Sequence, residues 1–119
     1  MVRVLLAEDD SAMLDVVRRA LSADGHAVTT AHDGQEALDL LSAAGAAFDV
    51  MLTDIHMPGI NGIELTDKAV AMMPKLRVLL MSASTDTAIP DALKPYVAEV
   101  LSKPLALDQV RSAVRSAIG

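Results

Sequence analysis

The sequence contains no cysteine, few aromatic residues and a clear excess of negative charge. Without thiols the chain has neither a disulfide framework nor a thiolate metal site. Phe48 and Tyr96 are the two aromatic residues among 119, too few for a platform on which nucleic-acid bases could stack. Ten lysines and arginines stand against sixteen acidic residues, giving a formal net charge of −6. Direct nucleic-acid binding, which requires a basic face, is therefore disfavoured.

Long apolar runs are also missing from the chain. None approaches the ~20 residues that span a bilayer, and the first residues enter an apolar strand without the layout of a signal peptide. Hydrophobic residues nevertheless make up 52% of the sequence, which is enough for a buried core. We therefore expect one cytoplasmic domain over residues 1–119, with no membrane contact.

Short apolar runs alternate with helical repeats along the chain. The runs predict buried strands at residues 2–7, 27–31, 50–53, 76–81 and 98–101. Apolar residues at three- to four-residue spacing predict helices at residues 11–23, 34–44, 63–72 and 107–118. This alternation predicts an α/β fold, in which a five-stranded parallel sheet is covered by helices on both faces.

The segment 85–97 should hold a fourth helix between the last two strands, but its apolar pattern is weak. Pro90 and Pro95 both interrupt it. Each proline costs about 3 kcal/mol inside a helix because it lacks an amide hydrogen and its ring clashes with the preceding turn. We expect this segment to be short, broken or mobile.

Polar side chains follow four of the five predicted strands. In an open α/β sheet the ligand site lies at the carboxyl ends of the strands. Each side chain has an ordinary role when taken alone: helix cap, loop aspartate, strand-end hydroxyl or solvated lysine. Their coincidence at one edge of the sheet favours a functional site instead. In chain order they are Glu8, Asp9 and Asp10, then Asp54, then Ser82, then Lys103.

The acidic residues of this set predict a metal ion. Glu8, Asp9 and Asp54 would repel one another if crowded together, and one of them would take up a proton unless a cation compensated. Mg²⁺ suits oxygen ligands of this kind and can neutralise the charge on a transferred phosphoryl group. Lys103 can add positive charge, and Asp54 can act as the nucleophile because a carboxylate accepts phosphate as a mixed anhydride.

These residues resemble the response-regulator receiver family, the CheY-like superfamily. The resemblance rests on the strand that leads into Glu8-Asp9-Asp10, on Asp-x-x-Met-Pro-Gly from Asp54, on Met81-Ser82-Ala83 and on Leu101-Ser102-Lys103-Pro104, and it runs through the whole chain in order. It implies a (βα)5 doubly wound sheet of strand order 2-1-3-4-5. It also implies a two-component system, with a histidine kinase or histidine phosphotransfer protein as phosphoryl donor.

The resemblance also implies a role for each residue of the site. Asp54 would be the phosphoacceptor, Glu8 and Asp9 the acidic metal pair, and Asp10 a neighbour of that pair. The backbone carbonyl of His56 would be a further Mg²⁺ ligand. Ser82 would be the switch hydroxyl, and Lys103 the cation that contacts the phosphoryl group, with a cis peptide bond before Pro104.

Other polar residues receive secondary assignments. The side chain of His56, together with Ser84, would set the lifetime of the phosphorylated state, by the same resemblance. His26 and His32 flank the second strand away from the site and should be surface residues.

Two positions depart from the family pattern. Receivers usually carry an aromatic residue three positions before the lysine, where this chain has Val100, and often Phe after Lys-Pro, where it has Leu105. Together with the prolines in the segment 85–97, these departures place the usual aromatic switch in doubt. They are similar to the CpdR type of single-domain receiver, which implies a regulated adaptor that delivers substrates to the ClpXP protease.

Three classes of function remain open from the sequence. The favoured one is a phosphorylation-controlled binding module that is not an enzyme and signals by protein contact, since no output domain is expected after Gly119. An aspartyl-phosphate phosphohydrolase would resemble Asp-x-Asp at its nucleophile, whereas this chain has His56 two residues after Asp54. A degenerate receiver that serves only as a scaffold is disfavoured because the acidic set, Ser82 and Lys103 are all present.

Overall fold

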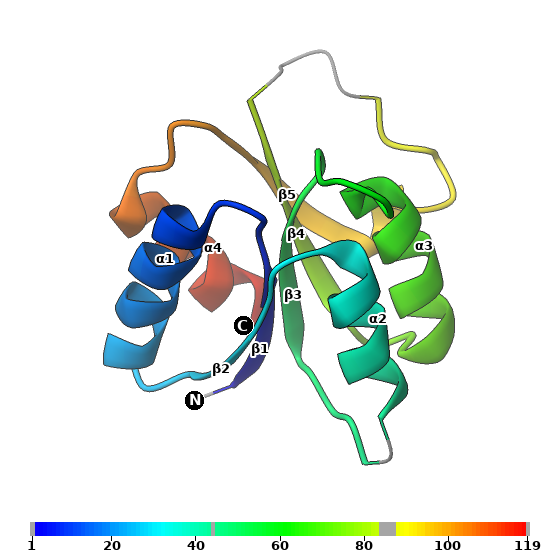
Figure 1. Ribbon diagram of the computed structural model, residues 1–119, viewed down its shortest axis with the longest axis horizontal. Coiled ribbons are helices and arrows are strands. Elements are labelled where there is room, and N and C mark those ends of the chain that lie inside the picture. The colour runs from blue at the N-terminus through cyan, green and yellow to red at the C-terminus, as the bar shows by residue number, and fades with distance from the viewer. Residues whose placement is uncertain (1, 44, 84–87, 119) are drawn as a thin grey trace.

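The computed structural model describes residues 2–43, 45–83 and 88–118. Its strands and helices alternate through most of the chain (Figure 1). The strands are β1 (Arg3–Ala7), β2 (Ala27–Ala31), β3 (Val50–Asp54), β4 (Arg77–Ser82) and β5 (Val97–Ser102). The helices are α1 (Ser11–Ala23), α2 (Gly34–Ser42), α3 (Gly62–Met72) and α4 (Leu107–Ile118), with a 3-10 turn, η1, at Lys94–Tyr96.

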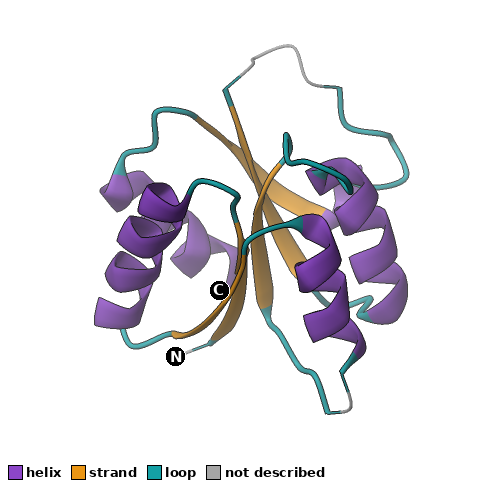
Figure 2. Ribbon diagram, in the orientation of Figure 1, coloured by secondary structure: helices purple, strands orange, loops and turns teal. Residues whose placement is uncertain are grey.

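The described strands form one parallel sheet in the order β2-β1-β3-β4-β5. Helices α1 and α4 lie on one face of this sheet, and α2 and α3 on the other (Figures 1 and 2). After β1 the chain places β2 on one side and β3 on the other, so the order reverses at β1. The predicted fold class and strand order are confirmed, and the reversal point is where a ligand site is expected in such a sheet.

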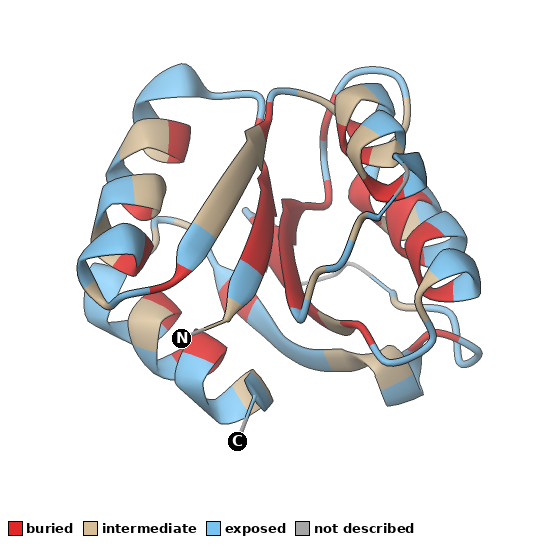
Figure 3. Ribbon diagram, turned by 90° about the horizontal axis from the view of Figure 1, so that it is seen from below, coloured by how far each residue is buried: buried red, intermediate tan, exposed pale blue. Residues whose placement is uncertain are grey.

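Two apolar layers hold the helices against the sheet. Val4 and Leu6 of β1 face α1 and α4, whereas Leu5 and Ala7 face α2 and α3, as alternate residues of a strand must. The central strand β3 is buried along its whole length because helices cover both of its faces. Figure 3 shows the same pattern, with buried residues on the sheet and on the inner sides of the helices.

Polar caps fix where three helices begin, close to the predicted positions. The side chain of Asp10 accepts hydrogen bonds from the amides of Ala12 and Met13 at the start of α1. Asp33 and Asn61 cap α2 and α3 in the same way. The bounds of α1, β2 and α4 agree with the prediction, and those of the other elements differ by one or two residues.

The connection between β4 and β5 departs most from a regular βα unit. The described part of it, residues 88–96, forms tight turns that end in η1. The amides of Leu93, Lys94 and Tyr96 each bond to a carbonyl three residues back, and Pro95 has no amide hydrogen to continue a helix. The expectation of a short, irregular fourth helical segment is met there.

The helices are too short or too polar to cross a membrane. Within residues 2–43, 45–83 and 88–118, no helix combines the length and the apolar character that a bilayer crossing requires.

Candidate phosphoryl-transfer and metal site

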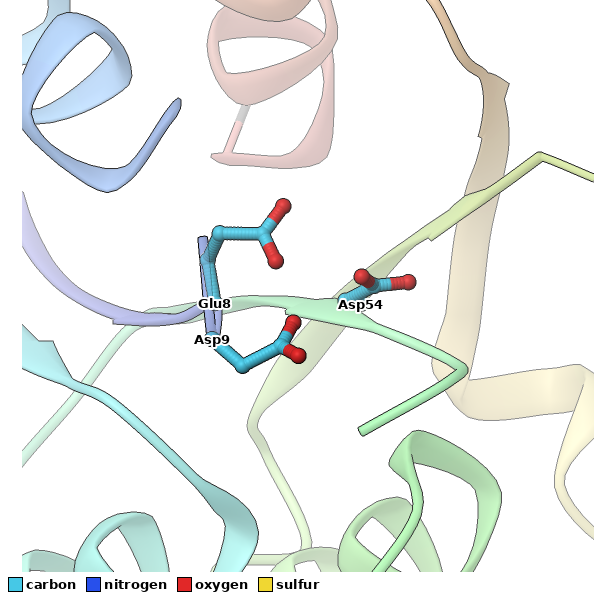
Figure 4. Close-up of side chains that lie close together, drawn as sticks. All are labelled: Glu8, Asp9 and Asp54. Carbon is cyan, nitrogen blue, oxygen red and sulfur yellow. The ribbon is translucent and has the colours of Figure 1, made fainter. Parts of the chain in front are cut away.

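The polar residues that follow the strands meet at one edge of the sheet. Glu8 and Asp9 come directly after β1, Asp54 is the last residue of β3, and Lys103 comes directly after β5. Because all the strands are parallel, their carboxyl ends lie together, and the side chains of Glu8, Asp9 and Asp54 converge there (Figure 4). Ser82, the last residue of β4, is buried at the same edge.

The three carboxylates are close enough to share one ion. One carboxylate oxygen from each of Glu8, Asp9 and Asp54 lies within 4.8 Å of the other two. Glu8 is fully buried and Asp54 is 5% exposed, whereas Asp9 faces solvent. The cluster therefore has two buried acids and one exposed acid, and a ligand can approach it from the side of Asp9.

Lys103 bridges the two buried acids. Its Nζ donates to Glu8 Oε1 at 2.8 Å and to Asp54 Oδ2 at 2.7 Å. The backbone amide of Lys103 bonds to the carbonyl of Ser82 at 2.8 Å, which ties the residue after β5 to the end of β4. The peptide bond between Lys103 and Pro104 is cis, as the sequence predicted.

The charges at this edge do not balance. Three carboxylates and one ammonium leave a net charge of −2 when all are ionised. The pKa of the Glu8 carboxyl is raised to about 7: burial is the largest cause, Lys103 opposes it, and Asp9 and Asp54 add to the rise. For Lys103, burial lowers the pKa, but the hydrogen bonds to Asp54 and Glu8 outweigh it and hold the pKa above its usual value.

Backbone groups hold Asp54 in place from the other side. The amide of His56 donates to Asp54 Oδ1 at 3.2 Å, and the imidazole of His56 is exposed to solvent. Gly62, the first residue of α3, donates its amide to the carbonyl of Ile55 at 2.8 Å. A Cβ at Gly62 would clash with the Asp54 carbonyl oxygen and lie 2.7 Å from Ile55 Cα. The sequence showed only a turn there; the close approach of α3 to β3 became visible with the fold.

The other candidate residues fall into distinct positions. Asp10 caps α1 and lies beside the acidic cluster, with its amide 3.4 Å from Glu8 Oε2. His32 is exposed, as expected, and Ser84 lies outside the described residues. The expectation for His26 was wrong: the ring is buried, and its Nδ1 accepts the amide hydrogen of Val2 at 3.4 Å. The α1–β2 turn folds His26 against the start of β1, a long-range contact that the local sequence does not reveal.

Comparison with known proteins identifies the family. The response regulator receiver domain family matches residues 4–115, and the chain belongs to it. The chain is similar to the response regulator receiver protein CpdR of Brucella abortus, with 39% identity over 90% of this chain and 88% of CpdR. It is 32% identical to the response regulator MprA of Mycobacterium bovis over 97% of this chain but 50% of MprA. The match to CpdR thus spans most of both chains, and the match to MprA half of the relative.

A solved structure supports the same conclusion about the fold. A response regulator receiver domain protein from Clostridium thermocellum superposes with a TM-score of 0.87 at 28% identity, over 99% of this chain and 94% of that one. The protein is therefore a CheY-like receiver domain of the two-component response regulators.

Proposed function

We propose that Asp54 accepts a phosphoryl group, with Mg²⁺ held by Glu8, Asp9, Asp54 and the backbone carbonyl of His56. The observation that carries this proposal is the convergence of three carboxylates and one lysine at the switch point of the sheet. The donor set fits the ion, because hard divalent cations bind carboxylate and carbonyl oxygens. The net charge of −2 also equals what a divalent cation compensates.

The residues of the site fit an in-line transfer. A carboxylate oxygen of Asp54 attacks phosphorus, and the bond from phosphorus to the donor nitrogen of a phosphohistidine breaks, so that its electron pair returns to the imidazole. The product is an acyl phosphate on Asp54. Mg²⁺ held by Glu8, Asp9 and Asp54 would supply positive charge to the phosphoryl oxygens.

Lys103 and Ser82 complete the site in this proposal. The ammonium of Lys103 already contacts Asp54, so it can follow the negative charge from the carboxylate to the phosphoryl oxygens. The Ser82 hydroxyl ends the neighbouring strand and would report the phosphoryl group to the rest of the fold. Signalling requires that a partner bind the two states unequally, since a phosphate that stabilises both equally changes nothing.

The partners follow from the same reasoning. A histidine kinase or a histidine phosphotransfer protein would supply the phosphoryl group, and the output would be a protein contact. The similarity to CpdR and the resemblance noted in the sequence support a regulated adaptor for proteolysis as that output. The domain boundaries at 1–119 and the cytoplasmic location expected from the sequence are part of this proposal.

Phosphorylation of the isolated chain tests the proposal. The protein is incubated with Mg²⁺ and acetyl phosphate, and its intact mass is followed. We expect one labile phosphoryl group on the native chain and none on Asp54→Asn. Asp39→Asn, which removes an exposed acid of α2, is the matched control and should be phosphorylated normally. Absence of the adduct under all conditions would favour the scaffold, and turnover of unrelated phosphoesters would favour the phosphohydrolase.

A further inference from the structure

A groove lies beside the first turns of α3, and none of the carboxylates of the proposed phosphoryl-transfer site is among its lining residues. It has a volume of about 390 Å³. One wall is the N-terminal half of α3, and the other is the segment 90–93, which takes the place of a regular fourth helix (Figure 1). The groove therefore exists because the chain from Pro90 forms turns where a helix would have packed.

The floor of the groove is apolar. Ile63, Pro90 and Leu93 line it together with the exposed Ala92. Leu93 is buried beneath the surface and Ile63 packs partly against the core, so both present a fixed apolar surface to whatever enters. Such a floor favours a branched aliphatic side chain of a partner over a charged one.

The rim of the groove carries two exposed acids, and the exposed Lys68 lies close to them on the same helix. Glu64 and Asp67 lie one turn apart on α3, both exposed, and neither makes an ion pair within the described residues. Lys68 follows on the same helix, but it pairs with neither acid there. Lys94, which follows Leu93 in the chain, pairs with Asp91 at 2.8 Å. Glu64 and Asp67 are thus exposed acids that an external cation can reach, in competition with Lys68.

We propose that this groove binds a short basic segment of a partner protein, in which leucine-like residues alternate with lysine or arginine. The aliphatic side chains lie on the floor formed by Ile63, Pro90 and Leu93. The long basic side chains reach from the same segment to Glu64 and Asp67. Charge complementarity and the apolar floor select this partner over an acidic peptide or a nucleic acid. The surface is distinct from phosphoryl transfer and does not require Asp54 to be a phosphoacceptor.

A peptide titration tests the groove directly. The probe is acetyl-Arg-Leu-Lys-Leu-Arg-amide, added to the full, isotope-labelled chain and followed by amide NMR. We expect saturable shifts confined to the amides of residues 61–67 and 91–93, since Pro90 has no amide hydrogen. A peptide with glutamate in place of each basic residue, and one with serine in place of each leucine, should bind at least fivefold more weakly. If the native peptide leaves those amides unmoved, or the glutamate peptide binds equally well, the proposal is wrong.

Charge variants sharpen the test without disturbing the core. The double variant Glu64→Gln, Asp67→Asn should weaken binding of the basic peptide about fivefold, as loss of two exposed ion pairs implies. The matched control Asp39→Asn, Glu99→Gln removes the same two charges elsewhere, both from exposed positions, and should bind normally. If both double variants weakened peptide binding equally, the effect would come from net charge alone, and the proposal would be wrong.

Two further outcomes separate peptide binding in this groove from phosphoryl transfer and from self-association. Asp54→Asn should bind the peptide as the native chain does, so failure of the phosphoacceptor proposal and failure of this one are distinguishable. Ala92→Phe should fill the groove and abolish the shifts at 61–67. If those amides instead shift with protein concentration in the absence of peptide, a second copy of the chain occupies the groove, and the assignment to a basic partner is overturned.

Discussion

The two ends of the parallel sheet each carry an ionic cluster, and the clusters are built differently. At the carboxyl ends of the strands, three carboxylates lie close together, one lysine contacts two of them, and the pKa of Glu8 rises to about 7. At the other end, Arg111 of α4 donates two hydrogen bonds, of 2.6 and 2.9 Å, to Asp24, the residue after α1. That pairing, helped by Arg115 and His26 nearby, lowers the pKa of Asp24.

The two clusters differ in how their charges balance. The bidentate pair of Asp24 and Arg111 ties the end of α1 to α4, and Arg111 also lies 3.6 Å from the exposed Asp108. The Glu8–Asp54–Lys103 cluster keeps excess negative charge in a partly buried place, which costs stability until a cation or a proton compensates. In the proposed function, Mg²⁺ would remove that cost.

The pH dependence of stability should show this contrast most strongly. Glu8 has a folded pKa of about 7, above its ordinary value of 4.5, so the folded chain binds more protons than the unfolded chain between those values. Stability without Mg²⁺ should therefore fall as pH rises from about 4.5 to 7, by roughly 2–3 kcal/mol. Asp24 contributes the opposite slope at lower pH, because its stabilisation is lost on acidification.

Urea unfolding between pH 4.5 and 8 measures that profile. Glu8→Gln should remove the decline with rising pH, and saturating Mg²⁺ should flatten it in the native chain because the ion takes the place of the proton. A native profile that rises steadily over this range would show that Glu8 does not carry a raised pKa.

Removal of Lys103 should distinguish the contribution of its ammonium group at Asp54 from the contribution of Mg²⁺. Lys103→Ala should slow phosphorylation by acetyl phosphate about a hundredfold, since it removes a cation that contacts the reacting carboxylate. Mg²⁺ affinity, followed by amide shifts, should be largely retained, because the oxygen ligands remain. Lys68→Ala removes an exposed lysine of α3 and serves as the control. A loss of Mg²⁺ affinity as severe as in Asp9→Ala would contradict the role given to Lys103.

The close packing of Gly62 against the backbone after β3 should contribute to stability. Gly62→Ala should lower stability by about 2 kcal/mol, because its Cβ meets the Asp54 carbonyl and the backbone of Ile55. Gly59→Ala, in the loop before α3, places its Cβ more than 4 Å from the atoms around it and should cost about 1 kcal/mol, for its positive φ alone. Chemical denaturation of both variants measures the difference, and equal losses would mean that the α3–β3 contact relaxes freely.

The sequence predicted the sheet and the cluster more completely than it predicted the surroundings. Periodicity placed the strands, and parallel strands bring their carboxyl ends together, so Glu8, Asp54 and Lys103 could be grouped from the sequence alone. The prolines at 90 and 95 correctly predicted an irregular connection.

Long-range contacts escaped sequence reasoning. The burial of His26 depends on Val2 and the end of α1, and the pairing of Arg111 with Asp24 joins residues 87 apart in the chain. Neither has a local sequence signal, because each depends on how two distant elements pack. The groove beside α3 likewise requires the actual path of residues 90–93.

Replacing one aspartate by asparagine at each end of the sheet should change stability slightly, with opposite sign at the two ends. Asp9→Asn removes an exposed charge that repels Glu8 and Asp54, so without Mg²⁺ the chain should gain up to about 1 kcal/mol of stability. Asp24→Asn should lose stability, because Arg111 then loses its closer charged partner and keeps only the longer contact with Asp108. Unfolding of both variants at pH 7.5 with and without Mg²⁺ measures the pair. The gain in Asp9→Asn should disappear when the ion is added, since the native chain then binds it more tightly. If both variants were destabilised equally in the absence of Mg²⁺, the acids at the ligand end would be structural partners like Asp24, and the contrast between the two ends would fail.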